Sequence, residues 1–445
     1  MKKNSFYIVS LGCAKNLVDS NVLAQLLEKE GLTYARSAKQ AEFVLVNTCG
    51  FIHDARQESL DTLQELSNDL NLQQKIIATG CLAERWRDEL LRQNPRLNGF
   101  IGTRSLEDIL PLVHRLKSNM GAEGTAYPSY PALRYPYGTS YTAIQGGSSY
   151  LKIADGCHRS CAFCAIPGIK GPLVSRPKPD VVQDALFLQS EGVREINLIA
   201  QDLTAYGIDR GEKDGLANLL AKLLPQIPNV PWVRLLYIYP GMVTDRLIDL
   251  MAAENQLVPY LDIPLQHADP DVLRKMRRPS DVNWVRCTIQ KMRARISGLA
   301  VRTTFIVGFP NETEESFQTL VDFVNEIGFD HLGVFTYSPE ADTESFGLPD
   351  IVPQEVKDER KDRLMELQSH ISEEKNQSLI GQTLDVLVEG QDEAQGIIVG
   401  RSYRDAPEID GLVVARSSAQ TGEITRVKIE TAGPYDLFGS QVLSS

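Results

Sequence analysis

The sequence predicts a multidomain α/β protein made of three successive units. We expect a three-layer α/β domain at residues 1–117, a partial parallel (β/α)6 barrel at 150–350, and a small antiparallel, OB-like β-barrel at 380–445. Strand-like apolar runs that alternate with helical stretches predict the first two units. Short β-type runs between turn residues predict the third. A linker at 118–149 and a connecting helix at 351–379 complete the expected organisation.

The composition is that of a globular protein without membrane segments. Single cores stop growing near about 250–300 residues, so a chain of 445 residues is expected to contain several domains. No apolar run is long enough for a membrane span, and the N-terminal apolar stretch is too short for a signal sequence. Seven scattered cysteines do not suit a disulfide scaffold, and free thiols need a reducing compartment. We therefore expect a cytoplasmic protein.

In the first unit, three strand-like runs each end at a cysteine flanked by glycine. The cysteines are Cys13, Cys49 and Cys81, and the helical stretches after them are expected at 17–29, 55–66 and 84–93. The carboxyl ends of parallel strands share one edge of a sheet, where open α/β sheets bind ligands. Three thiols at that edge would converge, which predicts a cysteine-bound cluster. For any one of them alone, a buried free thiol is the alternative.

The second unit opens with a tight cysteine motif, and Cys157, Cys161 and Cys164 give the spacing CxxxCxxC. Structural zinc sites close their coordination with four protein ligands. Three thiolates on one loop instead suit three corners of an iron–sulfur cube whose fourth iron stays open. An open iron can bind a substrate or cofactor, so the motif predicts chemistry. A structural zinc loop is the alternative.

Six strand-like runs alternate with helical stretches in this unit, which predicts a barrel short of the full eight strands. The runs are expected at 150–154, 195–200, 232–238, 260–263, 301–307 and 331–336. Active sites of such barrels lie at the carboxyl ends of the strands. The polar candidates there are Gln201, Asp202, Tyr237, Tyr239, Gln266, His267 and Tyr337. For His267, a place at the barrel mouth and a hydrogen-bonding role behind it are equally open. Cys287, in a helical stretch, is expected to be a buried core thiol.

The flanking segments differ in character from the barrel. Residues 118–149 are rich in Gly, Pro, Ser and Tyr, which predicts a linker or draped loop. Residues 352–379 predict a charged amphipathic helix. After it, β-type runs at 382–388, 396–400, 412–415 and 425–430 predict a small closed barrel. From Gly381 onward five basic and ten acidic residues give a net charge of −5, within −12 for the chain. This acidic balance favours a basic partner. A protein that binds nucleic acid through its phosphates needs a basic face instead.

The cysteine motif follows an apolar run at 150–154 and resembles that of the radical S-adenosylmethionine (SAM) superfamily. In that superfamily the open iron binds the amino and carboxylate groups of SAM. The resemblance implies that Phe163, before the third cysteine, packs beside the SAM adenine. It also implies that Gly308, in Thr-Thr-Phe-Ile-Val-Gly-Phe-Pro, supplies a backbone element beside the adenine. A simple packing residue and a simple turn glycine are the alternatives.

Taken in order, the three units resemble the radical SAM methylthiotransferase family, and the last unit is similar to a TRAM domain. One branch modifies an aspartate of the twelfth small-subunit ribosomal protein, and the other modifies transfer RNA adenosine. Gly12-Cys-Ala-Lys-Asn is similar to the ribosomal branch, whereas tRNA-type members tend to have Gln-Met-Asn after the first cysteine. Three further segments resemble the ribosomal branch: Asn47-Thr-Cys-Gly-Phe-Ile, Ala200-Gln-Asp-Leu-Thr-Ala-Tyr-Gly and Tyr260-Leu-Asp-Ile-Pro-Leu-Gln-His. Ala341-Asp-Thr and the stretch before Tyr150 depart from the family pattern, away from any cluster ligand.

This resemblance implies two 4Fe-4S clusters and two uses of SAM. The cluster on Cys157, Cys161 and Cys164 would cleave SAM to a radical that abstracts hydrogen from the aspartate β-carbon. The auxiliary cluster on Cys13, Cys49 and Cys81 would hold the sulfur that another SAM methylates. Expected partners are a basic ribosomal protein, free or in the small subunit, and an electron-donor protein, with no membrane and no direct tRNA binding. A tRNA adenosine methylthiotransferase is the alternative.

Overall fold

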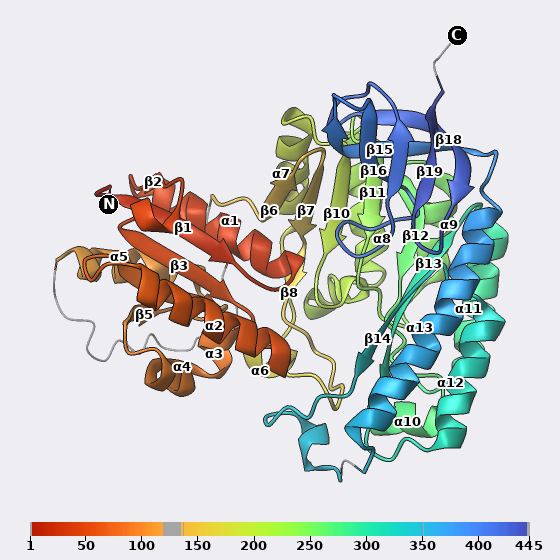
Figure 1. Cartoon of the computed structure of the whole chain (residues 1–445), viewed down its shortest axis with the longest axis horizontal. Helices are drawn as coiled ribbons and strands as arrows, with labels where there is room; N and C mark the ends of the chain where they lie inside the picture. The colour runs from red at the N-terminus through yellow and green to blue at the C-terminus, as the bar shows by residue number, and fades with distance from the viewer. Residues whose placement is uncertain (1, 119–134, 137, 350, 443–445) are drawn as a thin grey trace.

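The computed structural model describes residues 2–118, 135–136, 138–349 and 351–442. Figure 1 shows an N-terminal α/β domain beside a central open barrel, with a small β-barrel packed against one end of the central strands. The expected fold class is confirmed in all three units.

The N-terminal domain is a five-stranded sheet in the order β2-β1-β3-β4-β5, with every neighbouring pair parallel. The strands are β1 (Ser5–Ser10), β2 (Thr33–Tyr34), β3 (Phe43–Thr48), β4 (Lys75–Gly80) and β5 (Leu97–Phe100). Along β3, Phe43 and Leu45 enter one apolar cluster while Val44 and Val46 enter another. Both faces of the sheet are therefore covered, which explains why the strand reads as a continuous apolar run.

Helices form the two outer layers of this domain. They are α1 (Ala14–Lys29), α2 (His53–Asp69), α3 (Cys81–Arg85), α4 (Arg87–Gln93) and α5 (Ile109–Lys117). Helices α1 and α5 pack on one face of the sheet, and α2, α3 and α4 on the other. The single helix expected at 84–93 is two short helices, because Trp86 leaves helical geometry at φ −126° and ψ 39°.

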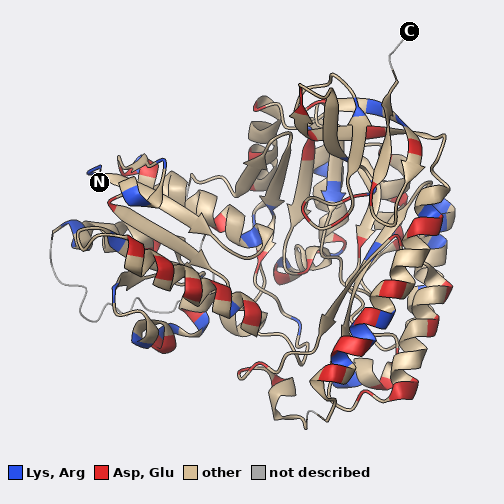
Figure 2. Cartoon of the chain, in the orientation of Figure 1, with Lys and Arg blue, Asp and Glu red and all other residues tan. Residues whose placement is uncertain are grey.

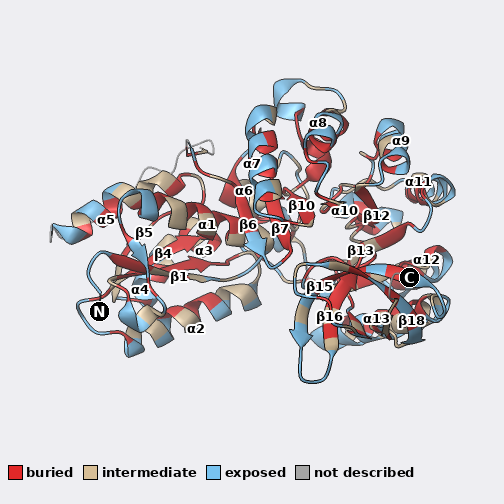
Figure 3. Ribbon diagram, turned by 90° about the horizontal axis from the view of Figure 1, so that it is seen from above, coloured by how far each residue is buried: buried red, intermediate tan, exposed pale blue. Residues whose placement is uncertain are grey.

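The central sheet has the order β14-β13-β12-β11-β10-β7-β6, in which six strands are parallel and β6 is an antiparallel edge. Its strands are β6 (Thr142–Gln145), β7 (Ser148–Lys152), β10 (Glu195–Ile199), β11 (Trp232–Leu235), β12 (Leu257–Asp262), β13 (Ala300–Val307) and β14 (His331–Thr336). The covering helices are α7 (Lys178–Ser190), α8 (Gly215–Leu223), α9 (Asp245–Ala253), α10 (Pro270–Lys275), α11 (Val282–Arg295) and α12 (Glu314–Ile327). Figure 3 shows buried strands inside this ring of helices, whose outer faces are exposed.

The expectation of a linker is wrong at 142–149, which forms the β6–β7 hairpin. Residues 119–134 and 137 of the expected linker lie outside the described residues.

The chain leaves the barrel through α13 (Gln354–Gln377), which runs beside β14 and α12 (Figure 1). It then forms a closed barrel in the order β15-β16-β17-β19-β18. The strands are β15 (Thr383–Asp392), β16 (Ile397–Ser402), β17 (Val413–Arg416), β18 (Ile424–Ala432) and β19 (Leu437–Gln441). The sequence predicts the first four but not β19, which pairs in parallel with β17, while the other pairs are antiparallel.

Buried ion pairs fix this small barrel to the amino ends of the central strands. Glu195, the first residue of β10, accepts hydrogen bonds from Arg234 Nε at 2.8 Å and from Arg401 Nη2 at 2.6 Å. All three side chains are fully buried. Tyr260 donates its hydroxyl to Asp410 at 2.6 Å. The carboxyl ends of the central strands are thereby left for the cysteine loops.

Candidate active site at two cysteine trios

The loops that carry the N-terminal cysteines pack directly against one another. Cys13 precedes α1, Cys49 follows β3, and Cys81 begins α3. Gly12 has φ +85°, and a Cβ there would lie 2.8 Å from the Cβ of Cys49. A Cβ on Gly50 would lie 2.7 Å from the Cα of Leu82. The flanking glycines are therefore required by close approach of the loops; the convergence of the three thiols on one cluster stays a prediction.

Asn16 joins the three loops through its side-chain amide. Its Nδ2 donates to the carbonyl oxygens of Leu11 at 3.0 Å and Thr48 at 3.1 Å. Its Oδ1 lies 3.8 Å from the sulfur of Cys81. No sequence pattern indicates this role, because the partners of Asn16 lie on other segments of the chain.

The thiols of this trio influence one another. Burial raises the pKa of Cys81; nearby Lys170 lowers it, and the Cys13 and Cys49 thiolates raise it further.

Within the described residues, no group of three or more His, Cys, Asp or Glu side chains suits a single metal ion. In an iron–sulfur cube each cysteine binds a different iron, so its ligands need not converge on one point. The donor set therefore fits a cluster.

The CxxxCxxC loop is held by backbone hydrogen bonds on both sides. Gly156, at φ +73°, precedes it, and a Cβ there would collide with the carbonyl oxygen of Pro172. The amide of Cys157 donates to Gly171 at 3.1 Å, and that of Ala162 donates to Met276 at 3.0 Å. Burial raises the pKa of Cys164 to about 12, and the neighbouring cysteine thiolates act in the same direction.

Two arginines enclose Tyr239 beside this loop. The Arg159 guanidinium lies 4.0 Å and the Arg278 guanidinium 4.2 Å from the centroid of the Tyr239 ring. Arg159 donates to Asp202 at 2.9 Å, and Arg278 Nη1 lies 3.7 Å from the sulfur of Cys161. Of the described side chains here, Arg159 Nη2, Arg278 Nε and Gln201 Oε1 are buried without a hydrogen-bond partner. Such unpaired groups suit a polar ligand in contact with the loop.

The remaining barrel candidates divide into two groups. Gln201 donates to Asp155 at 2.6 Å, and Tyr237 faces Lys15, so both lie near the cysteine loops. His267 is buried: its Nδ1 accepts from the amide of Asp269 at 2.9 Å, and its Nε2 lies 3.4 Å from Glu312. Of the two roles left open for His267, the hydrogen-bonding role behind the barrel mouth fits these contacts. The other two are also held within the barrel: Gln266 takes φ +76° and pairs its backbone with Thr304 and Ile306, and Tyr337 donates to Ser345 at 2.9 Å.

Phe163 and Gly308 lie on the same side of the barrel. Phe163 packs in an apolar cluster with Met276, Phe309 and Tyr337. Gly308 has φ +72°, its amide donates to Glu312 at 2.9 Å, and a Cβ there would collide with the Lys357 side chain. Apolar packing explains Phe163 without a ligand, and the positive φ with the close Lys357 side chain requires glycine at 308. Their predicted places beside the adenine stay predictions.

The expectation for Cys287 is wrong. It is an exposed residue of α11. The buried positions of this helix are Val282, Val285, Ile289 and Met292, and Cys287 lies on the opposite face. Its sequence surroundings carry no ligand, and its position in the structure is a solvent-facing one.

A buried ion network joins the two cysteine loops across the domain boundary. Lys170 Nζ lies 2.8 Å from Asp19 and 3.3 Å from Asp155. Lys152 Nζ lies 2.8 Å from Asp155 and also pairs with Asp19. Asp19 lies on α1, which begins after Cys13, while Asp155 lies two residues before Cys157. Burial would raise the pKa of Asp155, but Lys152 and Lys170 hold it well below its usual range. Charged residues at these positions gave no sequence signal, because their partners are far apart in the chain.

Lys15 is a second residue that sequence reasoning missed. Its ammonium lies 3.3 Å from the centroid of the Tyr237 ring, at the carboxyl end of β11. Burial lowers the pKa of Lys15, but Tyr237 and Cys13 raise it, and the net shift is upward. Its place two residues after Cys13 is the signal that could have identified it.

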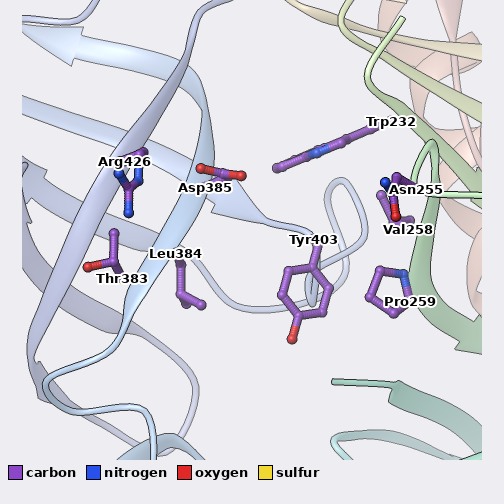
Figure 4. A pocket seen from close by; sticks show the side chains of 9 residues that line it. All are labelled: Trp232, Asn255, Val258, Pro259, Thr383, Leu384, Asp385, Tyr403 and Arg426. Atoms are coloured by element: carbon purple, nitrogen blue, oxygen red, sulfur yellow. The ribbon is translucent and has the colours of Figure 1, made fainter. Parts of the chain in front are cut away.

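A cleft of about 310 Å³ lies elsewhere, between the small barrel and the amino ends of β11 and β12 (Figure 4). Trp232, Asn255, Val258 and Pro259 line one wall, and Thr383, Leu384, Asp385, Tyr403 and Arg426 line the other. None of these residues belongs to a cysteine loop, so the cleft is separate from the candidate active site.

Family models match three parts of the chain. They describe an uncharacterized protein family (UPF0004) at residues 5–102, the radical SAM superfamily at 151–324, and a TRAM domain at 380–442.

Among solved structures, the cobalamin- and [4Fe-4S]-containing radical SAM methyltransferase TsrM from Kitasatospora setae has a TM-score of 0.55 at 16% identity, covering 76% of this chain and 77% of that one. The radical SAM enzyme OxsB has a TM-score of 0.52 at 11% identity, covering 82% of this chain and 56% of that one. These likenesses show a shared fold. Among the described helices, none has the length and apolar character that a membrane crossing needs.

Curated relatives cover nearly the whole chain. The ribosomal protein uS12 methylthiotransferase RimO of Microcystis aeruginosa is 42% identical over 99% of both chains. The protein of that name from Pelotomaculum thermopropionicum is 43% identical, covering 98% of this chain and 99% of its own. That of Aquifex aeolicus is 41% identical, covering 97% and 96% respectively. The chain belongs to the RimO family of radical SAM methylthiotransferases.

Proposed function

We propose that this chain adds a methylthio group to the β-carbon of an aspartate in ribosomal protein uS12. The observation that carries the proposal is the joining of two cysteine trios by the buried Asp19–Lys170–Asp155 network. A rigid link between the trios suits a reaction that needs two metal groups acting on one substrate. Membership of the RimO family names the substrate.

Cys157, Cys161 and Cys164 would hold one 4Fe-4S cluster, and Cys13, Cys49 and Cys81 the auxiliary one. When bound, the clusters and SAM supply the radical chemistry and the methylthio group, which no side chain can provide for an unactivated C–H bond. The chain's own part is to orient and exclude water. Asp202 and Tyr239 orient Arg159 beside the SAM-binding trio, and the unpaired Arg159 and Arg278 nitrogens suit the polar groups of SAM. We place Phe163 and Gly308 near its adenine.

The charge of the TRAM domain supports a protein substrate. Seven acidic and three basic residues of this domain are exposed. Figure 2 shows where charged residues lie along the chain. Arg401 and Arg404, which are buried in ion pairs, add nothing to the surface. An acidic surface attracts a basic ribosomal protein and opposes phosphate binding. The proposal includes an electron-donor protein, a cytoplasmic location, and no direct binding of tRNA or membranes.

Mass spectrometry of reaction products tests this function. Anaerobically reconstituted protein is incubated with SAM, a reductant, and either uS12 or unmodified tRNA. We expect uS12 to gain one methylthio group in place of one hydrogen at a single aspartate, and tRNA to remain unchanged. A uS12 variant with asparagine at that aspartate is the matched control and should not be modified. Methylthio incorporation into tRNA adenosine instead would overturn the proposal.

A further inference from the structure

Lys15 places a positive charge between the loop of Cys13 and the carboxyl end of β11. It is the second residue of α1, two residues after Cys13, and its Nζ lies 3.3 Å from the centroid of the Tyr237 ring. Tyr237 follows β11 at the carboxyl end of the barrel strands. The ammonium therefore faces the barrel mouth from the N-terminal domain.

Among the described residues, no carboxylate lies within ion-pair distance of Lys15. The neighbouring buried lysines differ: Lys152 and Lys170 both pair with Asp19 and Asp155. The two nearby acids are thus fully engaged. A partly buried ammonium that rests on an aromatic face is incompletely compensated, and an anion that reached it would be bound favourably.

The start of α1 adds to this positive region. Its first turn contains no acidic residue, and the side chain of Cys13 makes no capping hydrogen bond. The amino end of a helix favours negative charge; its first turn carries no carboxylate, and the sulfur of Cys13 at the cap is the group of its own that can carry such charge. Helix end and Lys15 together make a site for a small anionic group, such as a carboxylate.

We propose that Lys15 binds the carboxylate of the target aspartate and thereby selects aspartate over uncharged residues. This inference rests on the proposed function. The β-carbon is bonded directly to the carboxylate carbon, so holding the carboxylate also fixes the carbon that reacts. Lys15 enters from the loop of Cys13 and Tyr237 from the barrel, so the carboxylate would be held where the two halves of the site meet.

A double-mutant cycle on the reconstituted holoenzyme tests the role of Lys15. Binding of two synthetic uS12 peptides is measured anaerobically by fluorescence anisotropy, one with the target aspartate and one with asparagine in its place. Wild-type protein should bind the aspartate peptide about tenfold more tightly, as expected for a close charge pair. Lys15→Met, which keeps a similar length, should bind both peptides equally. Lys15→Arg should recover part of the preference.

Lys29→Met is the matched control for net charge. Lys29 is exposed at the far end of the same helix, about 21 Å away at 1.5 Å per residue. It should keep the wild-type preference for aspartate. Lys15→Met should also keep the iron content and the cluster absorption spectrum of the wild type, because Lys15 is not a ligand.

Two results with Lys15→Met would overturn this role. If Lys15→Met weakens both peptides by the same factor, Lys15 acts on the fold or on SAM and not on the carboxylate. If Lys15→Met loses iron, it serves the auxiliary cluster. Failure of the proposed function is distinguishable, because wild-type protein would then modify neither uS12 nor its peptide. A wild type that modifies uS12 yet binds both peptides equally defeats only the inference about Lys15.

Discussion

Four of the six candidate ligand cysteines lie directly beside a glycine that the structure requires: Cys13, Cys49, Cys81 and Cys157. Gly12 and Gly156 take positive φ angles of +85° and +73°, and a side chain at either would strike a neighbouring loop. Chemistry and local conformation are therefore specified together by adjacent residues. This adjacency, together with the CxxxCxxC spacing of Cys157, Cys161 and Cys164, is why the six ligands could be proposed from sequence.

Separate removal of the two trios should separate two partial activities. Changing Cys157, Cys161 and Cys164 to alanine should leave about half of the iron expected for two four-iron clusters and abolish reductive SAM cleavage. Changing Cys13, Cys49 and Cys81 to alanine should also leave about half of the iron but spare SAM cleavage, while methylthio transfer ends. Iron analysis and product chromatography of 5′-deoxyadenosine measure both effects.

The exposed Cys287 supplies a matched control for these variants. Cys287→Ala should retain full iron, SAM cleavage and methylthio transfer, because its side chain faces solvent. Full iron retention by the CxxxCxxC variant would contradict its assignment as a cluster ligand set. Wild-type methylthio transfer by the N-terminal variant would make that trio structural.

The residues that sequence reasoning missed or misplaced share a physical cause. Asn16 and Lys15 act on partners that other strands bring to them, such as Thr48 and Tyr237. One-dimensional spacing does not report these contacts. Cys287 is exposed although cysteine is commonly a buried residue type, because its position on α11 faces away from the core. It is two residues, or about 200°, around the helix from buried Val285.

At the scale of elements, strands with strong apolar patterns were predictable, whereas the short strands β6 and β19, which contain or adjoin glycine, were not. β6 is four residues long, with Gly146-Gly147 between it and β7. Two glycines between strand runs are a hairpin signal, but the proline- and glycine-rich segment before them favoured a linker. β19 contains Gly439, where an added Cβ would collide with the carbonyl oxygen of Lys428. Glycine weakens a strand pattern even where close packing requires it.

The stability of the contact between β10, β11 and β16 should depend on pH, because Glu195 joins these three strands. Burial alone would raise the pKa of Glu195, but Arg234 and Arg401 lower it below its ordinary value. A carboxylate with a depressed pKa contributes stability above its unfolded pKa, about 4.3, and loses it as pH falls through the folded value. Glu195→Gln should cost about 3–5 kcal/mol near neutral pH, because two buried arginines lose their partner. This difference should shrink below about pH 4.3.

Denaturant unfolding of both proteins over this pH range measures the effect of Glu195. Glu389→Gln is the control, since Glu389 also pairs with Arg401 but is 33% exposed. Its loss should cost less than about 1 kcal/mol. An equal cost for both substitutions, or a Glu195→Gln cost that does not change with pH, would show that the buried ion pairs do not anchor the TRAM domain.

At the scale of the whole molecule, the acidic TRAM domain and the cysteine loops lie at opposite ends of the central strands. Arg401 reaches Glu195 at the amino end of β10, whereas Cys157 and Tyr237 lie toward the carboxyl ends. The TRAM surface therefore does not line the candidate active site. Its charge can act on a substrate through the long-range field, which raises the rate of association.

Charge reversal on the TRAM surface should slow capture of uS12 without changing SAM cleavage. Asp392 and Glu393 are exposed at the end of the β15–β16 hairpin. Replacing both with lysine should lower the association rate several-fold at low salt, with less effect near physiological ionic strength, where exposed charges are screened over about 8 Å. Stopped-flow binding to uS12 across a salt series measures this association rate. The rate of the neutral double variant, Asp392→Asn with Glu393→Gln, should fall between those of the wild type and the charge reversal.

A nucleic-acid substrate predicts the opposite change in association rate, because added lysines would strengthen phosphate binding. Faster capture of tRNA than of uS12 by the unmodified chain would therefore exclude the acidic surface as a guide for a basic protein.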